Sequence, residues 1–241
     1  MFFVEYDSRD AAFYFSVEEF FTNYAVVPEP VYILWQTGKT VMLGSNQAVS
    51  AEVDLNYAKE HDIQIVRRSS GGGAIYTDPG TFLYTVIQPI TKDIKIHREE
   101  VAGEIINAIG KMGITAMREG RNDILIKGKK ISGFAQYTKS NYVCTHGSLL
   151  FDADLDVLTK VLIPNEAKLI PKGISSIKSR VTNIRPYTDK EYTTVEFYAE
   201  LKMHLFSDKK IINYTLNDDD LLKINHIFKK KYGNNKWNFR I

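Results

Sequence analysis

Apolar residues recur along this chain with two different spacings, which predict helices and strands in turn. A spacing of three and four residues begins after Asp10, a suitable helix N-cap, and appears again between Arg98 and Met112. The apolar face of the first of these helices consists of Phe13, Val17, Phe20, Phe21 and Tyr24. A capping box formed by Thr193 and Glu196 predicts another helix. The remaining expected helices span 54–61, 155–162 and a segment that begins at 218.

Short runs rich in β-branched and aromatic residues predict the strands. The segments 31–36 and 40–43 flank a short turn, and we expect them to form a hairpin. A second hairpin is expected between Asp123 and Lys130, where two short strands flank a Lys-Gly turn. The other expected strands are 1–7, 63–66, 81–87 and 145–151. Because helices alternate with pairs of strands, we predict an α+β fold with mixed or antiparallel sheets.

The charge pattern argues against nucleic acid as a partner. The chain has 31 Lys and Arg residues against 29 Asp and Glu residues, so its net charge of +2 creates no strong positive field. The dense basic run 229–231 ends a predicted helix that begins with the acidic run 218–220, and both runs complement the helix dipole. A second basic segment, Ile174 to Lys178, is expected to be a connection between elements.

The composition predicts a soluble, cytoplasmic protein. With 241 residues, of which 44% are apolar, the chain is long enough to bury a sizeable core. Its single cysteine, Cys144, excludes an internal disulfide and fits a reducing compartment. The N-terminus has no signal-peptide pattern, and no apolar run approaches the roughly 20 residues that a membrane helix needs.

The stretch RRSSGGGAIY, at 67–76, carries the first chemical signal. It places two arginines, two hydroxyl groups and three glycines directly after a predicted strand. Glycines let a ligand approach the backbone N–H groups, and arginine supplies a permanent charge that suits phosphate or carboxylate. Taken alone, this stretch is better explained as a glycine-rich turn beside surface charges, but the motif is compatible with an anion site.

A second block strengthens that interpretation. The segment 120–133, GRNDILIKGKKISG, is followed by THGSLL at 145–150. The predicted hairpin would bring Asp123 and Lys130 to one cleft. A carboxylate there can hold Mg²⁺, while an ammonium group stabilises charge on a phosphate.

These blocks resemble a known family. RRSSGGGAIY, GRNDILIKGKKISG, HGSLLF and GISSIKSRVTNI occur in nearly the order and spacing of the catalytic domain of A-type lipoate–protein ligases. The resemblance implies the biotin/lipoate protein ligase fold, which is related to class II aminoacyl-tRNA synthetases, with residues 1–241 as a single catalytic domain. The small C-terminal domain of long members is expected to be absent, so a separate accessory protein could take its place.

The resemblance also implies an activity. Such an enzyme uses ATP and Mg²⁺ to convert lipoate into lipoyl-AMP. It then transfers the lipoyl group to a lysine of an acceptor domain, such as 2-oxoacid dehydrogenase E2 or glycine-cleavage H protein. No nucleic acid or membrane takes part.

The family's functional residues can be matched to positions of this sequence. Lys130 is expected to be the catalytic lysine, which bridges carboxylate and phosphate, and Asp123 is expected to approach Mg²⁺. The expected ATP-binding residues are Arg68, Gly73, Ala74, Ile75, Tyr76, Asn122, Asp123 and Lys130. The expected lipoate-binding residues are Trp35, Arg68, Ser70, Gly71, Gly72, Lys130 and His146. We expect His146 to border the acyl chain near its carboxyl end, although a core role explains this histidine, and also Trp35, equally well.

Three other functions compete with this one. An ATP-independent lipoyl or octanoyl transferase of the same fold needs a cysteine thiolate, and Cys144 is the only candidate. A biotin ligase is disfavoured by three adjacent glycines. A pseudoenzyme that only binds lipoyl-AMP is disfavoured because both Lys130 and Asp123 are present.

Overall fold

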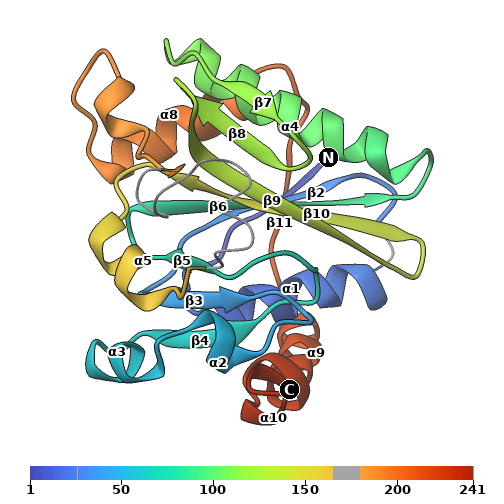
Figure 1. Ribbon diagram of the computed structural model, residues 1–241. Helices are drawn as coiled ribbons and strands as arrows, with labels where there is room; N and C mark the ends of the chain where they lie inside the picture. Colours follow the sequence, from blue (N-terminus) through green and yellow to red (C-terminus); the bar gives the residue numbers. More distant parts are fainter. Residues whose placement is uncertain (26, 165–179, 241) are drawn as a thin grey trace.

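The computed structural model describes residues 1–25, 27–164 and 180–240 (Figure 1). Within these ranges the strands form two sheets. The eight-stranded sheet has the order β11 (Ile212–Tyr214), β1 (Phe2–Val4), β2 (Val31–Trp35), β6 (Thr81–Pro89), β10 (Tyr142–Leu150), β9 (Lys129–Lys139), β8 (Asp123–Ile126) and β7 (Met117–Glu119). The three-stranded sheet has the order β4 (Gln64–Arg67), β3 (Thr40–Leu43) and β5 (Ile75–Thr77). Both sheets contain parallel and antiparallel pairs, so the predicted α+β fold with mixed sheets is confirmed.

Helices cover both faces of the large sheet. The long helices are α1 (Ala11–Asn23), α4 (Ile94–Lys111), α8 (Thr194–Phe206) and α9 (Asp218–Ile227). The short ones are α2 (Val49–Glu52), α3 (Leu55–Glu60), α5 (Leu155–Val161) and α10 (Asn235–Asn238), with a 3₁₀ turn, η2 (Arg185–Tyr187), and a π-helical turn, η3 (Phe228–Tyr232). Helices α4 and α8 share one apolar core with the large sheet, and α1 and α9 share a second core on its other side (Figure 1). No helix among the described residues is long and apolar enough to cross a membrane.

The predicted hairpin of segments 31–36 and 40–43 is wrong. Strand β2 pairs with β1 and β6 in the large sheet, whereas β3 pairs with β4 and β5 in the small one. Both strands are buried along their whole length, and each has a neighbour on either side. The turn between them therefore carries the chain from one sheet to the other.

The local signals for helix ends predicted the structure more accurately. Asp10 and Asp54 each accept a hydrogen bond from the first turn of a helix, and the Thr193 capping box is complete. The main differences lie at two boundaries: α4 begins at Ile94 instead of Arg98, and Tyr24 lies beyond α1 with 54% of its surface exposed. The segment Ile174 to Lys178, which was predicted to be a connection, lies outside the described residues.

The hairpin between Asp123 and Lys130 forms as predicted. Lys127 and Gly128, which connect β8 to β9, both have positive φ, of 47° and 76°. A two-residue turn of this kind matches the natural twist of the strands that it joins. The turn thus fixes the relative placement of Asp123 and Lys130.

Candidate active site

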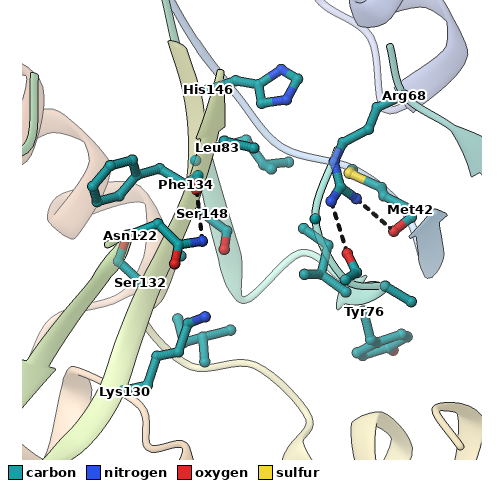
Figure 2. Close-up of a pocket in the computed structure, with 18 of the residues that line it drawn as sticks. Met42, Arg68, Tyr76, Leu83, Asn122, Lys130, Ser132, Phe134, His146 and Ser148 are labelled. Atoms are coloured by element: carbon teal, nitrogen blue, oxygen red, sulfur yellow. Dashed lines mark hydrogen bonds between the residues drawn. The ribbon is translucent and has the colours of Figure 1, made fainter. Parts of the chain in front are cut away.

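A cavity of about 630 Å³ lies between the two sheets. Strands β9 and β10 form one wall, and the glycine loop with β5 and α5 forms the other (Figure 2). Most of the predicted site residues line it, namely Trp35, Arg68, Gly72, Gly73, Ala74, Ile75, Tyr76, Asn122, Asp123, Lys130 and His146. Ser70 and Gly71 are not among the described residues that line the cavity, because Ser70 is fully buried behind it and Gly71 faces solvent.

One end of the cavity is highly polar. The Lys130 ammonium lies 2.6 Å from one carboxylate oxygen of Asp123, and an Arg180 nitrogen lies 2.7 Å from the other. Burial on its own raises the pKa of the Asp123 carboxyl, but Lys130 and Arg180 outweigh it, so that pKa is lower than usual. Asp123 is therefore ionised at neutral pH, and it holds two cations at the mouth of the cavity. Asn122 beside it is fixed by a hydrogen bond to the Phe134 carbonyl oxygen.

The arrangement around Asp123 does not favour magnesium ligation. Both oxygens of the carboxylate already contact cationic groups, and a divalent ion in the same place would meet two positive charges within a few ångströms. The cluster suits an anion better than a third cation. The assignment of Mg²⁺ to Asp123 therefore stays a prediction that this geometry does not support.

Gly133 lies directly beneath the Lys130 side chain. A Cβ atom at this position would be 2.6 Å from the Lys130 Nζ atom and 2.8 Å from its Cε atom. Glycine is thus required here for the close approach of the lysine, and not for a special backbone conformation. The Ile-Ser-Gly sequence that follows Lys130 places this glycine three residues after it, on the same strand.

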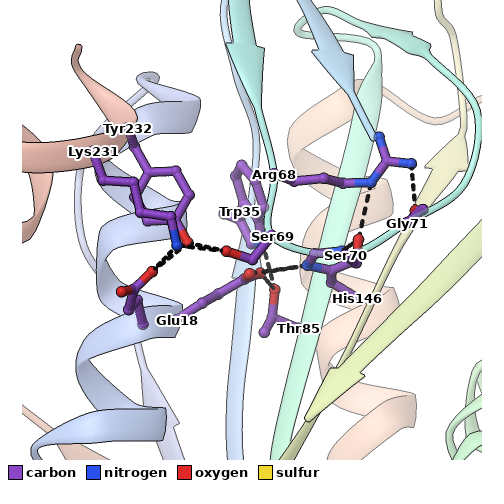
Figure 3. Close-up of polar contacts among 11 residues, drawn as sticks. Glu18, Trp35, Arg68, Ser69, Ser70, Gly71, Thr85, His146, Lys231 and Tyr232 are labelled. Carbon is purple, nitrogen blue, oxygen red and sulfur yellow. Dashed lines mark hydrogen bonds and ion pairs between the residues drawn. The ribbon is translucent and has the colours of Figure 1, made fainter. Parts of the chain in front are cut away.

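The anion-site interpretation of the motif predicted one site for all four polar side chains of the glycine loop. In the structure these side chains do not converge on one site. Successive residues of an extended chain point in opposite directions. Arg68 and Ser70 bond each other on the side of His146, while Ser69 points the other way, towards Lys231 and Tyr232 (Figure 3). Arg67, the remaining polar residue, is fully buried against the C-terminal segment.

Arg68 holds the loop in shape from the inside. Its guanidinium donates to the Ser70 hydroxyl and to the carbonyl oxygens of Met42, Gly71 and Gly73, at 2.8–3.0 Å. Burial lowers the pKa of Arg68 to about 10, so the group stays charged at neutral pH. Within the loop, Gly72 adopts a φ of +100°, which favours glycine. The predicted contact of Arg68 with an anion stays a prediction, and its visible role is to position the loop.

The other end of the cavity is closed by a buried hydrogen-bond network. His146 bonds the Ser70 hydroxyl through Nε2, at 2.6 Å, and a carboxylate oxygen of Glu18 through Nδ1, at 2.9 Å (Figure 3). Glu18 also accepts a hydrogen bond from Thr85, which in turn accepts one from the indole of Trp35. Both ring nitrogens of His146 are therefore hydrogen-bonded within the protein. This fits a structural role in the core, which was one of the two roles that the sequence left open.

Glu18 was missed by the sequence analysis. It lies within α1 and is 1% exposed. Its only signal in the sequence is that the residues three positions before and after it on the helix, Phe15 and Phe21, are apolar. Its partners Thr85 and His146 are 67 and 128 residues away, so no pattern in the neighbouring sequence indicates these contacts.

Lys130 and His146 mark opposite ends of the cavity (Figure 2). His146 pairs with Ala135 on β9, and Lys130 stands five residues earlier on that strand, which corresponds to roughly 16 Å. If Lys130 binds a carboxylate, His146 cannot border the same end of that ligand. The expectation that His146 lies near the carboxyl end is therefore not supported. The cavity suits an elongated apolar molecule with an anionic group at one end.

Proteins of known structure share this fold. The Ta0514 protein of Thermoplasma acidophilum with bound lipoic acid superposes with a TM-score of 0.85 at 22% identity, covering 99% of this chain and 98% of that one. A lipoate–protein ligase A with bound ATP superposes with a TM-score of 0.83 at 22% identity, covering 99% and 97%. A bipartite archaeal ligase from Thermoplasma acidophilum, whose structure was analysed together with its E2 lipoyl domain, gives 0.85 at 24% identity, covering 98% and 95%. The overall fold is thus that of lipoate–protein ligases.

The sequence identifies the family. Residues 10–206 match the lipoyl protein ligase A/B catalytic domain. Lipoate–protein ligase LplJ of Bacillus subtilis is 35% identical, with 93% of this chain and 69% of that protein covered. Lipoate–protein ligase 1 of Staphylococcus aureus is 30% identical (93% and 68%), and a lipoate–protein ligase of Streptococcus pyogenes is 34% identical (83% and 60%). The chain therefore belongs to the lipoyl protein ligase A/B catalytic-domain family, and it spans 60–69% of the length of these three relatives.

Proposed function

We propose that this chain is the catalytic domain of an ATP-dependent lipoate–protein ligase. The observation that carries the proposal is the cluster of Lys130, Asp123 and Arg180 at one end of a long and otherwise mainly apolar cavity. Lipoate has the matching shape, with a carboxylate at one end and an apolar chain. The apolar residues that line the cavity include Phe15, Met42, Leu83, Leu158, Leu162 and Ile163.

The chemistry follows from the poor reactivity of a carboxylate towards an amine. The carboxylate of lipoate attacks the α-phosphate of ATP, pyrophosphate leaves, and a lipoyl-adenylate remains in the cavity. A lysine amine of the acceptor then attacks the mixed anhydride and displaces AMP. Negative charge builds up on the phosphate in the first step and on the carbonyl oxygen in the second. A fixed ammonium at the junction of the two groups stabilises both.

Each part of the site has a place in this scheme. Lys130 bridges the acyl carboxylate and the α-phosphate, and Asp123 and Asn122 hold their surroundings in place. The loop and strand from Gly73 to Tyr76 run along the nucleotide, whose phosphates can accept hydrogen bonds from backbone N–H groups. Magnesium enters with the nucleotide in this proposal. Trp35 and His146 enclose the far end of the acyl chain.

The acceptor is proposed to be a lipoyl domain. The bipartite archaeal ligase of the same fold was studied together with an E2 lipoyl domain, which supports E2 domains as acceptors, with glycine-cleavage H protein as a second candidate. That archaeal ligase is bipartite, which supports a separate accessory protein that completes adenylation. We place the reaction in the cytoplasm.

Pyrophosphate release tests the first step of the proposal. The purified chain, incubated with ATP, Mg²⁺ and lipoate, is expected to release pyrophosphate only when lipoate is present. The test is repeated with octanoate, which measures the preference between the two acids. Release at the same rate without any acid would contradict the assignment.

Replacement of Gly133 by alanine is expected to lower activity without lowering stability much. The new methyl group would occupy the space of the Lys130 ammonium, and the flexible lysine can move away at little cost in folding free energy. We expect kcat/KM for pyrophosphate release to fall by on the order of 10- to 100-fold, as for other small misplacements of a reacting group. Gly103→Ala, where nothing lies within 4 Å of the added carbon, is the matched control. Unchanged kcat/KM in Gly133→Ala would show that the position of Lys130 is unimportant.

The thiol of Cys144 is expected to be inert, which separates a ligase from a transferase that works through a thioester. Cys144 is fully buried, and burial together with the nearby Glu18 carboxylate raises the pKa of its thiol well above the usual value. The folded chain should therefore not react with a thiol-specific reagent, and Cys144→Ser should keep ATP-dependent lipoylation. Loss of acyl transfer in a folded Cys144→Ser variant would instead favour the transferase.

A further inference from the structure

The outer side of the glycine loop is held by the C-terminal segment of the described chain. This segment, Phe228–Arg240, comprises η3, α10 and the residues that follow them, and lies beyond the region that matches the family. Two residues of the loop motif, Arg67 and Ser69, contact it. Neither residue lines the cavity, as far as the described residues show.

Arg67 ties three segments together. Its side chain, which is 0% exposed, donates to the carbonyl oxygens of Trp237, Asn238 and Arg240 at 2.9–3.1 Å. The same guanidinium donates to the carbonyl oxygens of Gly44 and Gln47, at 3.0 and 2.6 Å. Main-chain contacts strengthen the junction. The Arg67 N–H donates to the Asn238 side chain, and the Trp237 indole donates to the Arg67 carbonyl oxygen.

The turn 44–47, whose carbonyl oxygens accept hydrogen bonds from Arg67, is itself packed against the glycine loop. The Ser45 N–H donates to the Ser70 carbonyl oxygen at 2.9 Å. A Cβ atom on Gly44 would lie only 2.1 Å from the Gly72 carbonyl oxygen, so the two backbones are in direct contact. A displacement of the C-terminal segment would therefore reach the loop through Arg67 and this turn.

Ser69 provides a second and more direct connection. The Lys231 ammonium donates to the Ser69 hydroxyl at 2.8 Å and pairs with Glu19 of α1 at 2.5 Å (Figure 3). The Tyr232 hydroxyl also bonds Ser69, at 2.7 Å, and donates to the same Glu19 oxygen. Lys231 was predicted to be part of a basic run that complements the helix dipole. Its side chain is instead 22% exposed and fully engaged in this network.

We propose that the segment Phe228–Arg240 positions the glycine loop for nucleotide binding, through Arg67 and Ser69, without touching the substrate. The inference rests on the proposed function for its ligand, ATP. Arg68 fixes the loop from the cavity side, and the C-terminal segment fixes it from the opposite side. Because the two sets of contacts alternate along the motif, the loop keeps its backbone N–H groups in place only when both are intact. Lys231 and Arg67 are positioning residues in this account.

Substitutions at Lys231 and Ser69 test the inference. Lys231→Met removes the bond to Ser69, Lys231→Arg retains a donor, and Lys230→Met is the matched control, because Lys230 is exposed in the same turn. Ser69→Ala removes the contact while leaving the Lys231–Glu19 pair intact, which serves if Lys231→Met fails to fold. For each variant, calorimetry measures the dissociation constants of ATP and of lipoate, at a temperature where the fold is intact.

The expected result is a selective loss of nucleotide affinity. The dissociation constant of ATP should rise by on the order of tenfold in Lys231→Met and Ser69→Ala, as expected for a binding group shifted by a fraction of an ångström. The lipoate value should stay unchanged, Lys230→Met should match the original chain, and Lys231→Arg should recover most of the affinity. Unchanged ATP affinity in folded variants, or equal losses for ATP and lipoate, would overturn the inference. Because binding is measured directly, this outcome is distinct from an unchanged chain that binds ATP but neither releases pyrophosphate nor transfers a lipoyl group from lipoyl-AMP, which would overturn the proposed function alone.

Discussion

Replacing Lys130 by alanine should abolish lipoate-dependent pyrophosphate release while leaving the fold intact. The ammonium is the cation that bridges carboxylate and phosphate, and removing a comparable preorganised donor lowers rates by on the order of 10²- to 10³-fold. The cost in stability should be small, because Asp123 keeps its ion pair with Arg180. Steady-state pyrophosphate release and thermal unfolding, measured on the same preparation, check both statements.

Lys129→Ala is the appropriate control for this substitution. Lys129 is the neighbouring residue on β9, carries the same charge and is exposed to solvent. Its replacement should leave the rate close to that of the unchanged chain. If Lys130→Ala and Lys129→Ala have equal rates, the catalytic assignment of Lys130 is wrong.

Replacing Arg67 by alanine should destabilise the whole domain. The guanidinium bonds the carbonyl oxygens of the turn 44–47 and of the segment 237–240, and its loss removes a donor from each of these buried or partly buried acceptors, of which Gly44 keeps the Gln47 N–H. A buried acceptor that loses its donor costs about 1–3 kcal/mol, and several lose a donor here, so the total should be about 3–5 kcal/mol. We expect a loss of this size in the free energy of unfolding, measured by urea denaturation.

Arg121→Ala serves as the control for Arg67, because Arg121 is exposed near the hairpin. Exposed substitutions of this kind usually change stability by less than about 0.5 kcal/mol. A loss of below about 1 kcal/mol in Arg67→Ala would show that the junction between β4 and the C-terminal segment contributes little.

The parts of the site that the sequence predicted well are those defined by local rules. The Lys127–Gly128 turn fixes a hairpin, and the hairpin brings Asp123 and Lys130 together, so their ion pair follows from about eight consecutive residues. Helix caps such as Asp10 and Asp54 also depend only on the next few residues. In these cases the physical cause lies within the segment itself.

The parts that were missed depend on contacts between distant segments. Arg67 and Arg68 are identical neighbours, and the alternation of an extended strand sends them to opposite sides. Nothing in the motif shows that one side is the cavity and the other is a segment 170 residues later. The same holds for Glu18, whose partner His146 comes 128 residues later. The hairpin expected from β2 and β3 failed for a related reason, because strand order is decided by the whole sheet.

The mass of an acceptor lipoyl domain tests the central claim most directly. The domain is incubated with this chain, lipoate, ATP and Mg²⁺, and in parallel with this chain and preformed lipoyl-AMP. The account predicts a mass gain of one lipoyl group on a lysine in the presence of lipoyl-AMP, and the same gain from lipoate and ATP if the chain adenylates on its own. No mass gain from lipoyl-AMP, with a chain that is folded and an acceptor that a known ligase modifies, would contradict the assignment of the cavity as a lipoyl-transfer site.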